Sequence, residues 1–129
     1  MKGCKRFIII DDDCVNNFLC SKMIENIVGD SHVSVYTNPY DALSGIANEY
    51  VGFGETATLL LDINMPEMTG WEFLAYFNKF HPEIKNRIKI CLLSGSIDNK
   101  DRVVAEANNN VSHFLAKPVS MEALAKVLN

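Results

Sequence analysis

A chain of 129 residues, 48% of them hydrophobic and 22% charged, has the size and composition of one globular domain, which excludes a disordered or fibrous protein. Its formal net charge of −4 and its scattered Lys and Arg residues argue against a nucleic-acid-binding surface, because phosphate backbones attract clustered basic side chains. No apolar run approaches the roughly 20 residues that cross a bilayer, so we expect neither a membrane span nor a membrane partner.

The amino-terminal segment does not have the pattern of a secretion signal. The apolar stretch behind its short basic start ends at Asp11, which leaves it too short for a signal peptide, so we predict a cytoplasmic protein. The four cysteines include no Cys-x-x-Cys pair; they are Cys4, Cys14, Cys20 and Cys91. We therefore expect no disulfide framework and no zinc site, with Cys91 as a small hydrophobic residue inside an apolar run.

Five short apolar runs are suited to β-strands. They lie at residues 7–10, 33–36, 57–61, 88–93 and 111–116. Three stretches of the first, third and fourth runs are continuously apolar, as strands covered on both faces should be: Phe7–Ile10, Leu59–Leu61 and Cys91–Leu93. Polar residues interrupt the second and the fifth runs. The second and fifth strands are therefore expected at the two edges of the sheet, which fits the strand order 2-1-3-4-5.

Helical patterns alternate with these runs. The first pattern places apolar residues at every fourth position before it stops at Gly29; these are Val15, Leu19, Met23 and Ile27. The second begins with Asn38 as N-cap and Pro39 at the first helical position. Its buried side is expected to hold Leu43, Ile46, Ala47 and Tyr50.

The other three patterns follow the third, fourth and fifth runs. One begins after Gly70, carries Phe73, Phe77 and Phe80, and is expected to end before Pro82. A weaker one follows Asp98, and the last starts at Ser120. Strict alternation of strands and helices predicts an α/β domain, a parallel sheet with helices on both faces.

Polar residues follow four of the five runs. Asp11, Asp12 and Asp13 come after the first, Asp62 after the third, Ser94 after the fourth and Lys117 after the fifth. The carboxyl ends of parallel strands meet at one edge, and ligands bind there at the reversal of strand order, here between the first and third strands. The side chains are therefore predicted to converge on one site.

The residue types at this edge indicate the chemistry. Carboxylates held close together repel, so the cluster needs either a cation or raised pKa values, and an all-oxygen site with few protein ligands suits Mg²⁺. A bound Mg²⁺ favours transfer of a phosphoryl group to a neighbouring aspartate, because the ion neutralises charge in the transition state. Lys117 can pair with a carboxylate or a phosphoryl oxygen, and the Ser94 hydroxyl can donate to the latter.

These motifs, in this order and spacing, resemble the receiver domain of bacterial two-component response regulators along the whole chain. They are Phe-Ile-Ile-Ile-Asp11-Asp12-Asp13, Leu-Leu-Leu-Asp62-Ile-Asn64-Met-Pro66 with Gly70, Leu-Leu-Ser94-Gly95, and Phe114-Leu-Ala-Lys117-Pro118. The resemblance implies a flavodoxin-like, doubly wound five-stranded parallel sheet with five helices on its two faces. It also implies one receiver domain over residues 1–129, with no output domain in this chain.

The resemblance assigns a role to each motif residue. Asp62 is the phosphoacceptor; Mg²⁺ is bound by Asp12, Asp62 and the backbone carbonyl of Asn64, and by Asp11 through water. Ser94 and Lys117 bind the phosphoryl group, and Phe114 is the aromatic switch position. The loops are shaped by Pro66, Gly70 and Pro118.

The resemblance also implies partners and an output. The phosphoryl donor is a sensor histidine kinase or a histidine phosphotransfer protein, and phosphorylation changes the face formed by the fourth helix, fifth strand and fifth helix, to which an unspecified target protein binds. Thr69 stands where the family often has an acidic residue, which alters the capping of the loop. Phe114 lacks the hydroxyl that a tyrosine would supply at the switch position.

Two alternatives stay open at this point. A haloacid-dehalogenase-like phosphatase would use Asp11 and Asp13 in its Asp-x-Asp motif, with Ser94 and a lysine, but only Glu122 follows Lys117 as a further acid, and Asp62 is left without a role. A receiver-like interaction module that is never phosphorylated would typically lack the acceptor or the lysine, and both are present here. Blander interpretations make Asp13 a helix cap, Lys117 a surface lysine and Phe114 an ordinary core residue.

Overall fold

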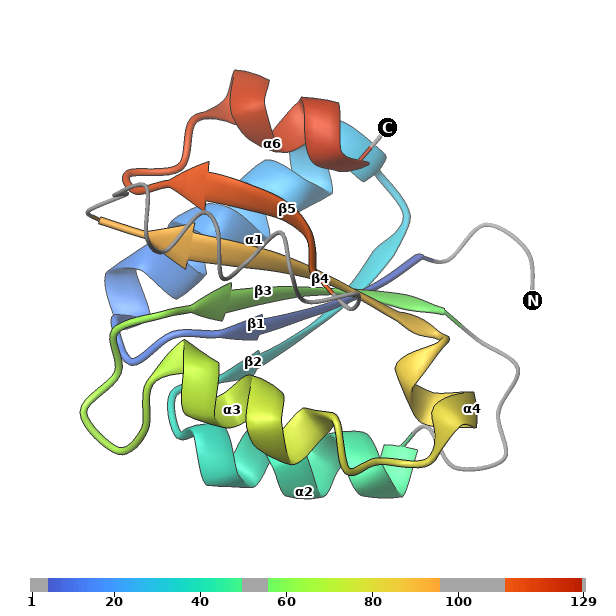
Figure 1. Ribbon diagram of the computed structural model, residues 1–129. Coiled ribbons are helices and arrows are strands. Elements are labelled where there is room, and N and C mark those ends of the chain that lie inside the picture. Colours follow the sequence, from blue (N-terminus) through green and yellow to red (C-terminus); the bar gives the residue numbers. More distant parts are fainter. Residues whose placement is uncertain (1–4, 50–55, 96–110, 129) are drawn as a thin grey trace.

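The computed structural model describes residues 5–49, 56–95 and 111–128 and contains one five-stranded parallel sheet (Figure 1). The strands are β1 (Lys5–Ile10), β2 (Ser31–Tyr36), β3 (Ala57–Asp62), β4 (Ile88–Ser94) and β5 (Val111–Ala116). Their order in the sheet is β2-β1-β3-β4-β5, and every neighbouring pair is parallel. The predicted strand positions and the predicted order are therefore confirmed.

Helices cover both faces of this sheet. They are α1 (Cys14–Val28), α2 (Pro39–Glu49), α3 (Gly70–Phe77), α4 (Pro82–Lys85) and α6 (Met121–Leu128). Figure 1 shows α1 and α6 together on one face and α2, α3 and α4 on the other. The helix predicted after Asp98 lies outside the described residues. No helix in the described part of the chain is long and apolar enough to span a membrane.

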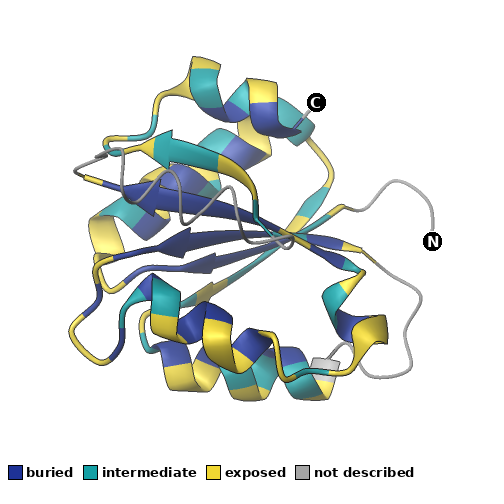
Figure 2. Ribbon diagram, in the orientation of Figure 1, coloured by how far each residue is buried: buried dark blue, intermediate teal, exposed yellow. Residues whose placement is uncertain are grey.

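Two hydrophobic cores sandwich the sheet, because side chains of a strand point alternately to its two faces. In β1, Ile8 and Ile10 belong to the core beneath α2 and α3, whereas Phe7 and Ile9 belong to the core beneath α1 and α6. The central strands are accordingly buried along most of their length, while the helices are buried only on their inner sides (Figure 2). Cys20 and Cys91 are buried free thiols, and Cys91 packs as a small hydrophobic residue within β4.

Only part of the four-residue apolar row in α1 packs against the sheet, since Met23 and Ile27 contact the core beneath α1 and α6. Val15 and Leu19 are 67% and 52% exposed, whereas Asn17, Cys20 and Ile24 are buried. Four residues advance an α-helix by about 400°, so a row with strict four-residue spacing drifts around the helix. The buried set alternates spacings of three and four, which keeps it on one side, against the sheet.

The third predicted helix is also shorter than expected. It ends at Phe77, and Pro82 begins the additional short helix α4 rather than merely ending α3. Proline suits a first helical turn because its missing N–H would have no partner there. Phe80 lies between the helices, with its ring edge-on to that of Phe77 at 5.7 Å.

In α2 the cap is as predicted, because the side-chain oxygen of Asn38 accepts a bond from the backbone N–H of Tyr40. Ile46 is buried, Leu43 and Ala47 are partly buried, and Tyr50 lies outside the described residues. The last helix, α6, follows Ser120 and buries Leu124, Val127 and Leu128.

Candidate functional site

The carboxyl ends of four strands bring the predicted polar residues to one edge of the sheet, at the arrowheads in Figure 1. Asp62 is the last residue of β3 and Ser94 the last of β4, while Asp11 and Lys117 directly follow β1 and β5. The strand register aligns these ends, since Ile10 pairs with Leu61, Asp62 with Leu93, and Ser94 with Ala116. The predicted convergence of Asp11, Asp62 and Lys117 is therefore present in the structure.

Asp11 is fully buried and heavily hydrogen-bonded. Its Oδ1 accepts the backbone N–H of Asp13 at 2.9 Å. Its Oδ2 accepts both the side-chain amide of Asn16 at 2.7 Å and the ammonium of Lys117 at 2.8 Å. A buried carboxylate is stable only when its oxygens have such partners. The first turn of α1 and Lys117 together supply them.

Asp62 is 3% exposed and has fewer partners. Its Oδ1 accepts the backbone N–H of Asn64 at 3.2 Å, and its Oδ2 lies 3.7 Å from the Lys117 ammonium. The pKa of Asp62 is raised to about 7, chiefly by burial and then by the neighbouring Asp11 charge, while Lys117 and the Asn64 N–H oppose the rise. A carboxylate in this position favours a cation or an incoming electrophile that relieves its desolvation.

Lys117 joins the two carboxylates, with its side chain 20% exposed. Burial alone would lower the pKa of Lys117, but the bond to Asp11 and the charge of Asp62 raise it above its ordinary value. The lysine is therefore held as a cation inside the site. The alternative of a surface lysine is wrong.

Asp11, Asp12 and Asp62 form an acidic cluster in which one oxygen from each lies within 4.8 Å of the others. An ion that binds oxygen at about 2.1 Å separates opposite ligands by about 4.2 Å, so small movements of these side chains fit Mg²⁺. Asp12 is exposed and open to such an ion, whereas both oxygens of Asp11 already accept hydrogen bonds. The donor set is the hard-oxygen type that Mg²⁺ prefers.

The neighbours of this cluster include one expected residue and two that sequence reasoning missed. Asp13 is the N-cap of α1, where its Oδ1 accepts the N–H groups of Val15 and Asn16, as its blander interpretation predicted. Asn16 binds the Asp11 carboxylate, and buried Asn17 donates to the Asp11 backbone carbonyl at 2.8 Å. Asparagine is a poor helix former, so two in succession in a first turn were the available signal.

The loop after β3 is fixed at both ends. Met65 and Met68 are buried, while Asn64 and Pro66 are exposed. Thr69 caps α3 through a capping box, in which its Oγ1 accepts the Glu72 N–H and the Glu72 carboxylate accepts the Thr69 N–H. This is the altered capping that Thr69 was expected to cause. It orients the loop that follows Asp62.

Gly70 packs directly against the backbone that carries Asp62. Its N–H donates to the Ile63 carbonyl at 2.7 Å, and a Cβ at this position would lie 2.9 Å from the Ile63 Cα and 3.1 Å from the Asp62 carbonyl oxygen. The backbone can approach this closely only because the residue is glycine. The loop-shaping role predicted for Gly70 thus has a steric basis.

We expect Gly70→Ala to lower the free energy of unfolding by about 1–3 kcal/mol, because the added methyl group must push backbone rather than a flexible side chain. Urea unfolding measures this change. Gly95→Ala is the matched control, since a Cβ at Gly95 meets no atom within 4 Å. Equal stability of the two variants would contradict the steric argument.

Three further predicted residues lie around the cluster. Ser94 is buried at the end of β4, and its carbonyl accepts the backbone N–H of Lys117 at 2.8 Å, which ties the ends of β4 and β5 together. Phe114 on β5 is partly buried and packs against the core beneath α2 and α3. Pro118 follows Lys117 through a cis peptide bond.

Comparison with protein families bears on the phosphatase alternative. The model of the response regulator receiver domain matches residues 7–129. The chain belongs to this family. Receiver domains are signalling modules of two-component phosphorelays, so the phosphatase alternative is not favoured.

Individual relatives agree with this family. Response regulator Rcp1 of Synechocystis is 25% identical over 96% of this chain and 84% of its own length. The 3',5'-cyclic-nucleotide phosphodiesterase regA of Dictyostelium discoideum is 30% identical over 96% of this chain, which spans only 15% of that relative. A two-component response regulator from Cytophaga hutchinsonii has the same fold, with a TM-score of 0.86, 31% identity, and coverage of 97% of this chain and 94% of that one.

Proposed function

We propose that this receiver domain accepts a phosphoryl group on Asp62, with Mg²⁺ at the acidic cluster, from a sensor histidine kinase or a histidine phosphotransfer protein. One observation carries the proposal: Asp62 is a buried carboxylate beside a second one, with the Lys117 ammonium 3.7 Å from its oxygen. A structural aspartate has no need of such neighbours, whereas an acceptor for a charged group does.

The metal ligands follow from the exposure of each acid. Exposed Asp12 and the free lone pairs of Asp62 would bind Mg²⁺ directly, together with the backbone carbonyl of Asn64. Asp11 would act through metal-bound water, because donors already occupy both of its oxygens. When bound, the ion supplies positive charge that offsets the charge of the transferring phosphoryl oxygens.

The chain's own residues then position the reaction. An Asp62 oxygen attacks phosphorus in line as the bond from phosphorus to the donor atom breaks, and the donor keeps the electron pair. Lys117 pairs with one phosphoryl oxygen, and the Ser94 hydroxyl donates to another. The domain would catalyse only its own phosphorylation and dephosphorylation, and residues 1–129 would form one domain.

The proposed output is the face formed by the helix predicted after Asp98, by β5 and by α6. Ser94 and Lys117 lie at the ends of β4 and β5, and Phe114 lies on β5, paired in register with Leu92 of β4. Movement of the Ser94 loop toward the phosphoryl group would change the packing of Phe114. On this side, a shallow cleft between β5 and α6 is lined by residues that include His113, Leu115, Ala123 and Val127. An unspecified target protein would bind this face.

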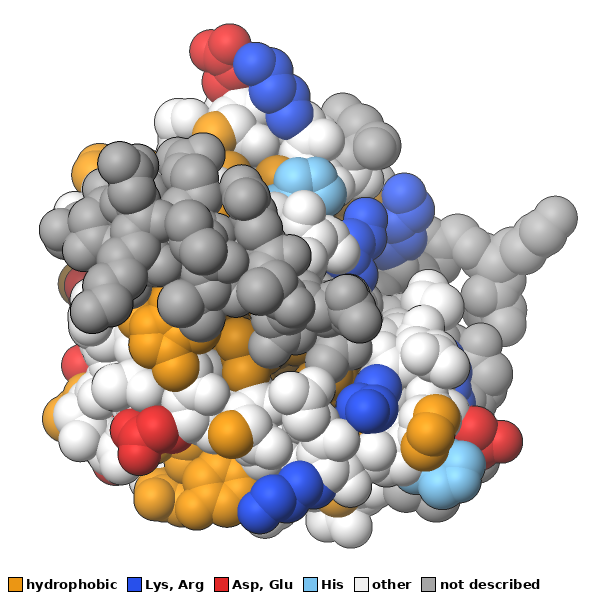
Figure 3. Space-filling model, viewed as in Figure 1, with side chains coloured by type: hydrophobic (Ala, Val, Ile, Leu, Met, Phe, Trp, Pro, Cys, Tyr) orange, Lys and Arg blue, Asp and Glu red, His pale blue; other side chains and the backbone are white. Residues whose placement is uncertain are grey.

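The surface argues against a nucleic-acid partner. On the face in Figure 3, the drawn Lys and Arg side chains are spread over several separate places and form no continuous basic patch. A phosphate backbone requires clustered basic groups. We therefore propose protein partners only.

The direct test is incubation with acetyl phosphate, with Mg²⁺ or with excess EDTA, followed by intact-mass measurement. We expect one added phosphoryl group with Mg²⁺ and none with EDTA, and reduction with borohydride followed by peptide mapping should locate it at Asp62. Labelling that does not depend on the metal, or that maps to another residue, would overturn the proposal. Sustained turnover of a generic phosphoester would favour the phosphatase alternative instead.

A further inference from the structure

Asn16 and Lys117 share one oxygen of Asp11. The side-chain amide of Asn16 donates to Asp11 Oδ2 at 2.7 Å, and the Lys117 ammonium donates to the same atom at 2.8 Å. The other oxygen, Oδ1, accepts the Asp13 N–H. Each of the two donors on Oδ2 comes from a different part of the fold, the first turn of α1 and the end of β5.

The presence of two donors on Asp11 Oδ2 has a consequence for the proposed phosphorylation of Asp62. Lys117 bonds Asp11 closely but lies 3.7 Å from Asp62, so it must shift to pair with a phosphoryl group on Asp62. Asp11 is fully buried, and a buried carboxylate that loses its only partner at one oxygen carries a large desolvation penalty. A second donor on Oδ2 removes that penalty.

We propose that Asn16 is a positioning residue for phosphoryl transfer, which holds the Asp11 carboxylate in place while Lys117 moves from Asp11 to the phosphoryl group. This inference rests on the proposed function of Asp62. Asn16 does not contact the phosphoacceptor itself. It acts by holding the Asp11 carboxylate, which allows Lys117 to leave Asp11.

The geometry makes Asn16 suited to this role. Its backbone N–H is anchored to Asp13 Oδ1 at 3.3 Å, so its short side chain cannot follow the phosphoryl group as the longer lysine can. Its amide is neutral, so it does not compete with Lys117 for the phosphoryl charge. Asn17 holds the backbone carbonyl of the same Asp11 from the next position. The first turn of α1 thus fixes both the side chain and the main chain of Asp11.

A purely structural role would be different in its consequences. If Asn16 only stabilised the start of α1, its removal would change the stability of the domain and leave the phosphoryl-bound state unaffected relative to the metal-bound state. A positioning role instead weakens the state in which Lys117 has left Asp11. The two roles are separated by measuring metal binding and phosphoryl-analogue binding in the same variant.

The experiment is a titration of the whole domain, first with Mg²⁺ alone and then with beryllofluoride at saturating Mg²⁺, by calorimetry and backbone chemical shifts. We expect Asn16→Ala to weaken beryllofluoride binding about five- to tenfold, the scale of one ordinary intramolecular hydrogen bond, with Mg²⁺ affinity changed less than about twofold. Asn16→Gln, which keeps the amide, should recover part of the loss. Asn26→Ala is the matched control, an exposed asparagine in the same helix.

Each result bears on a different part of the inference. If the unaltered domain fails to bind beryllofluoride with Mg²⁺, the proposed function is overturned and this inference with it. If it binds, but Asn16→Ala binds equally well, only the role of Asn16 is overturned. That role is also overturned if the variant loses Mg²⁺ and beryllofluoride affinity in equal proportion, or if Asn26→Ala shows the same loss.

Discussion

Asp62→Asn is expected to abolish phosphoryl acceptance and, in the metal-free domain, to raise the free energy of unfolding at pH 8. The physical reason is the raised pKa of Asp62, about 7 against an ordinary value of 3.8, which burial causes and the Asp11 charge increases. Above pH 7 the folded domain holds a buried anion that the unfolded chain would solvate. Asparagine has nearly the same shape and no charge, so it removes that penalty together with the nucleophile.

The sign of the pH dependence follows from proton linkage. Between about pH 4 and pH 7 the folded state keeps a proton on Asp62 that the unfolded state has lost, so stability falls as pH rises through this range and levels off above it. A shift of about three pK units corresponds to about 4 kcal/mol, and we expect about half of this, because the folded site relaxes around the charge. In Asp62→Asn this part of the pH dependence should disappear.

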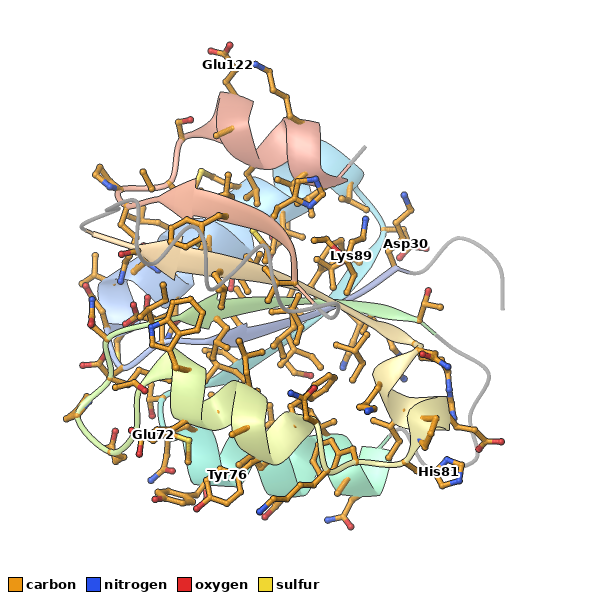
Figure 4. All side chains as sticks on the ribbon, viewed as in Figure 1. Asp30, Glu72, Tyr76, His81, Lys89 and Glu122 are labelled. Carbon is orange, nitrogen blue, oxygen red and sulfur yellow. The ribbon has the colours of Figure 1, made fainter. Side chains whose placement is uncertain are left out.

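Urea unfolding in EDTA at pH 5 and pH 8, together with intact-mass measurement after acetyl phosphate treatment, checks both halves of the expectation. Asp30→Asn is the matched control, because Asp30 is exposed and Figure 4 shows it at the end of the sheet opposite the site. If the stability of Asp62→Asn fell from pH 5 to pH 8 as much as that of the unaltered domain, the buried anion would belong to another group. Phosphorylation of that variant would place the acceptor elsewhere.

The layout of the site was predictable because it depends on few variables. Continuously apolar stretches such as Cys91–Leu93 must be covered on both faces, which fixes the sheet order, and the order fixes which strand ends are neighbours. Asp62 and Lys117 therefore converge whatever the details of the loops. The roles of Ser94, Phe114 and the metal ligands remain predictions, because they concern states with bound ion or phosphoryl group.

The features that sequence reasoning missed depend on packing between elements. The rotation of α1 about its own axis against the sheet determines that Asn17 is buried while Val15 and Leu19 are exposed. Sequence alone does not fix this rotation, because more than one side of the helix carries apolar residues. The bond between Asn16 and Asp11 follows from the same rotation. Similarly, His81 caps α4 with its Nδ1, far from the acidic cluster (Figure 4), a role that local sequence did not indicate.

Lys117→Met is expected to slow phosphorylation by acetyl phosphate about 100-fold at saturating Mg²⁺. This factor corresponds to the free energy of one strong hydrogen bond to a charged group. The same variant should lower the free energy of unfolding of the metal-free domain at pH 8 by about 2 kcal/mol, because Asp11 and Asp62 lose the cation between them. Methionine keeps the apolar stem of the lysine, so the change isolates the charge.

Two comparisons separate the electrostatic role of Lys117 from general damage to the fold. Addition of Mg²⁺ should restore stability to Lys117→Met more than to the unaltered domain, because the ion supplies positive charge where the ammonium was. It should not restore the rate, because the phosphoryl oxygen still lacks its partner. Lys89→Met is the matched control, an exposed lysine near the amino-terminal end of β4 that Figure 4 shows remote from the carboxyl ends of the strands. A wild-type rate in Lys117→Met would remove the lysine from phosphoryl transfer, and with it the movement for which Asn16 holds Asp11 in place.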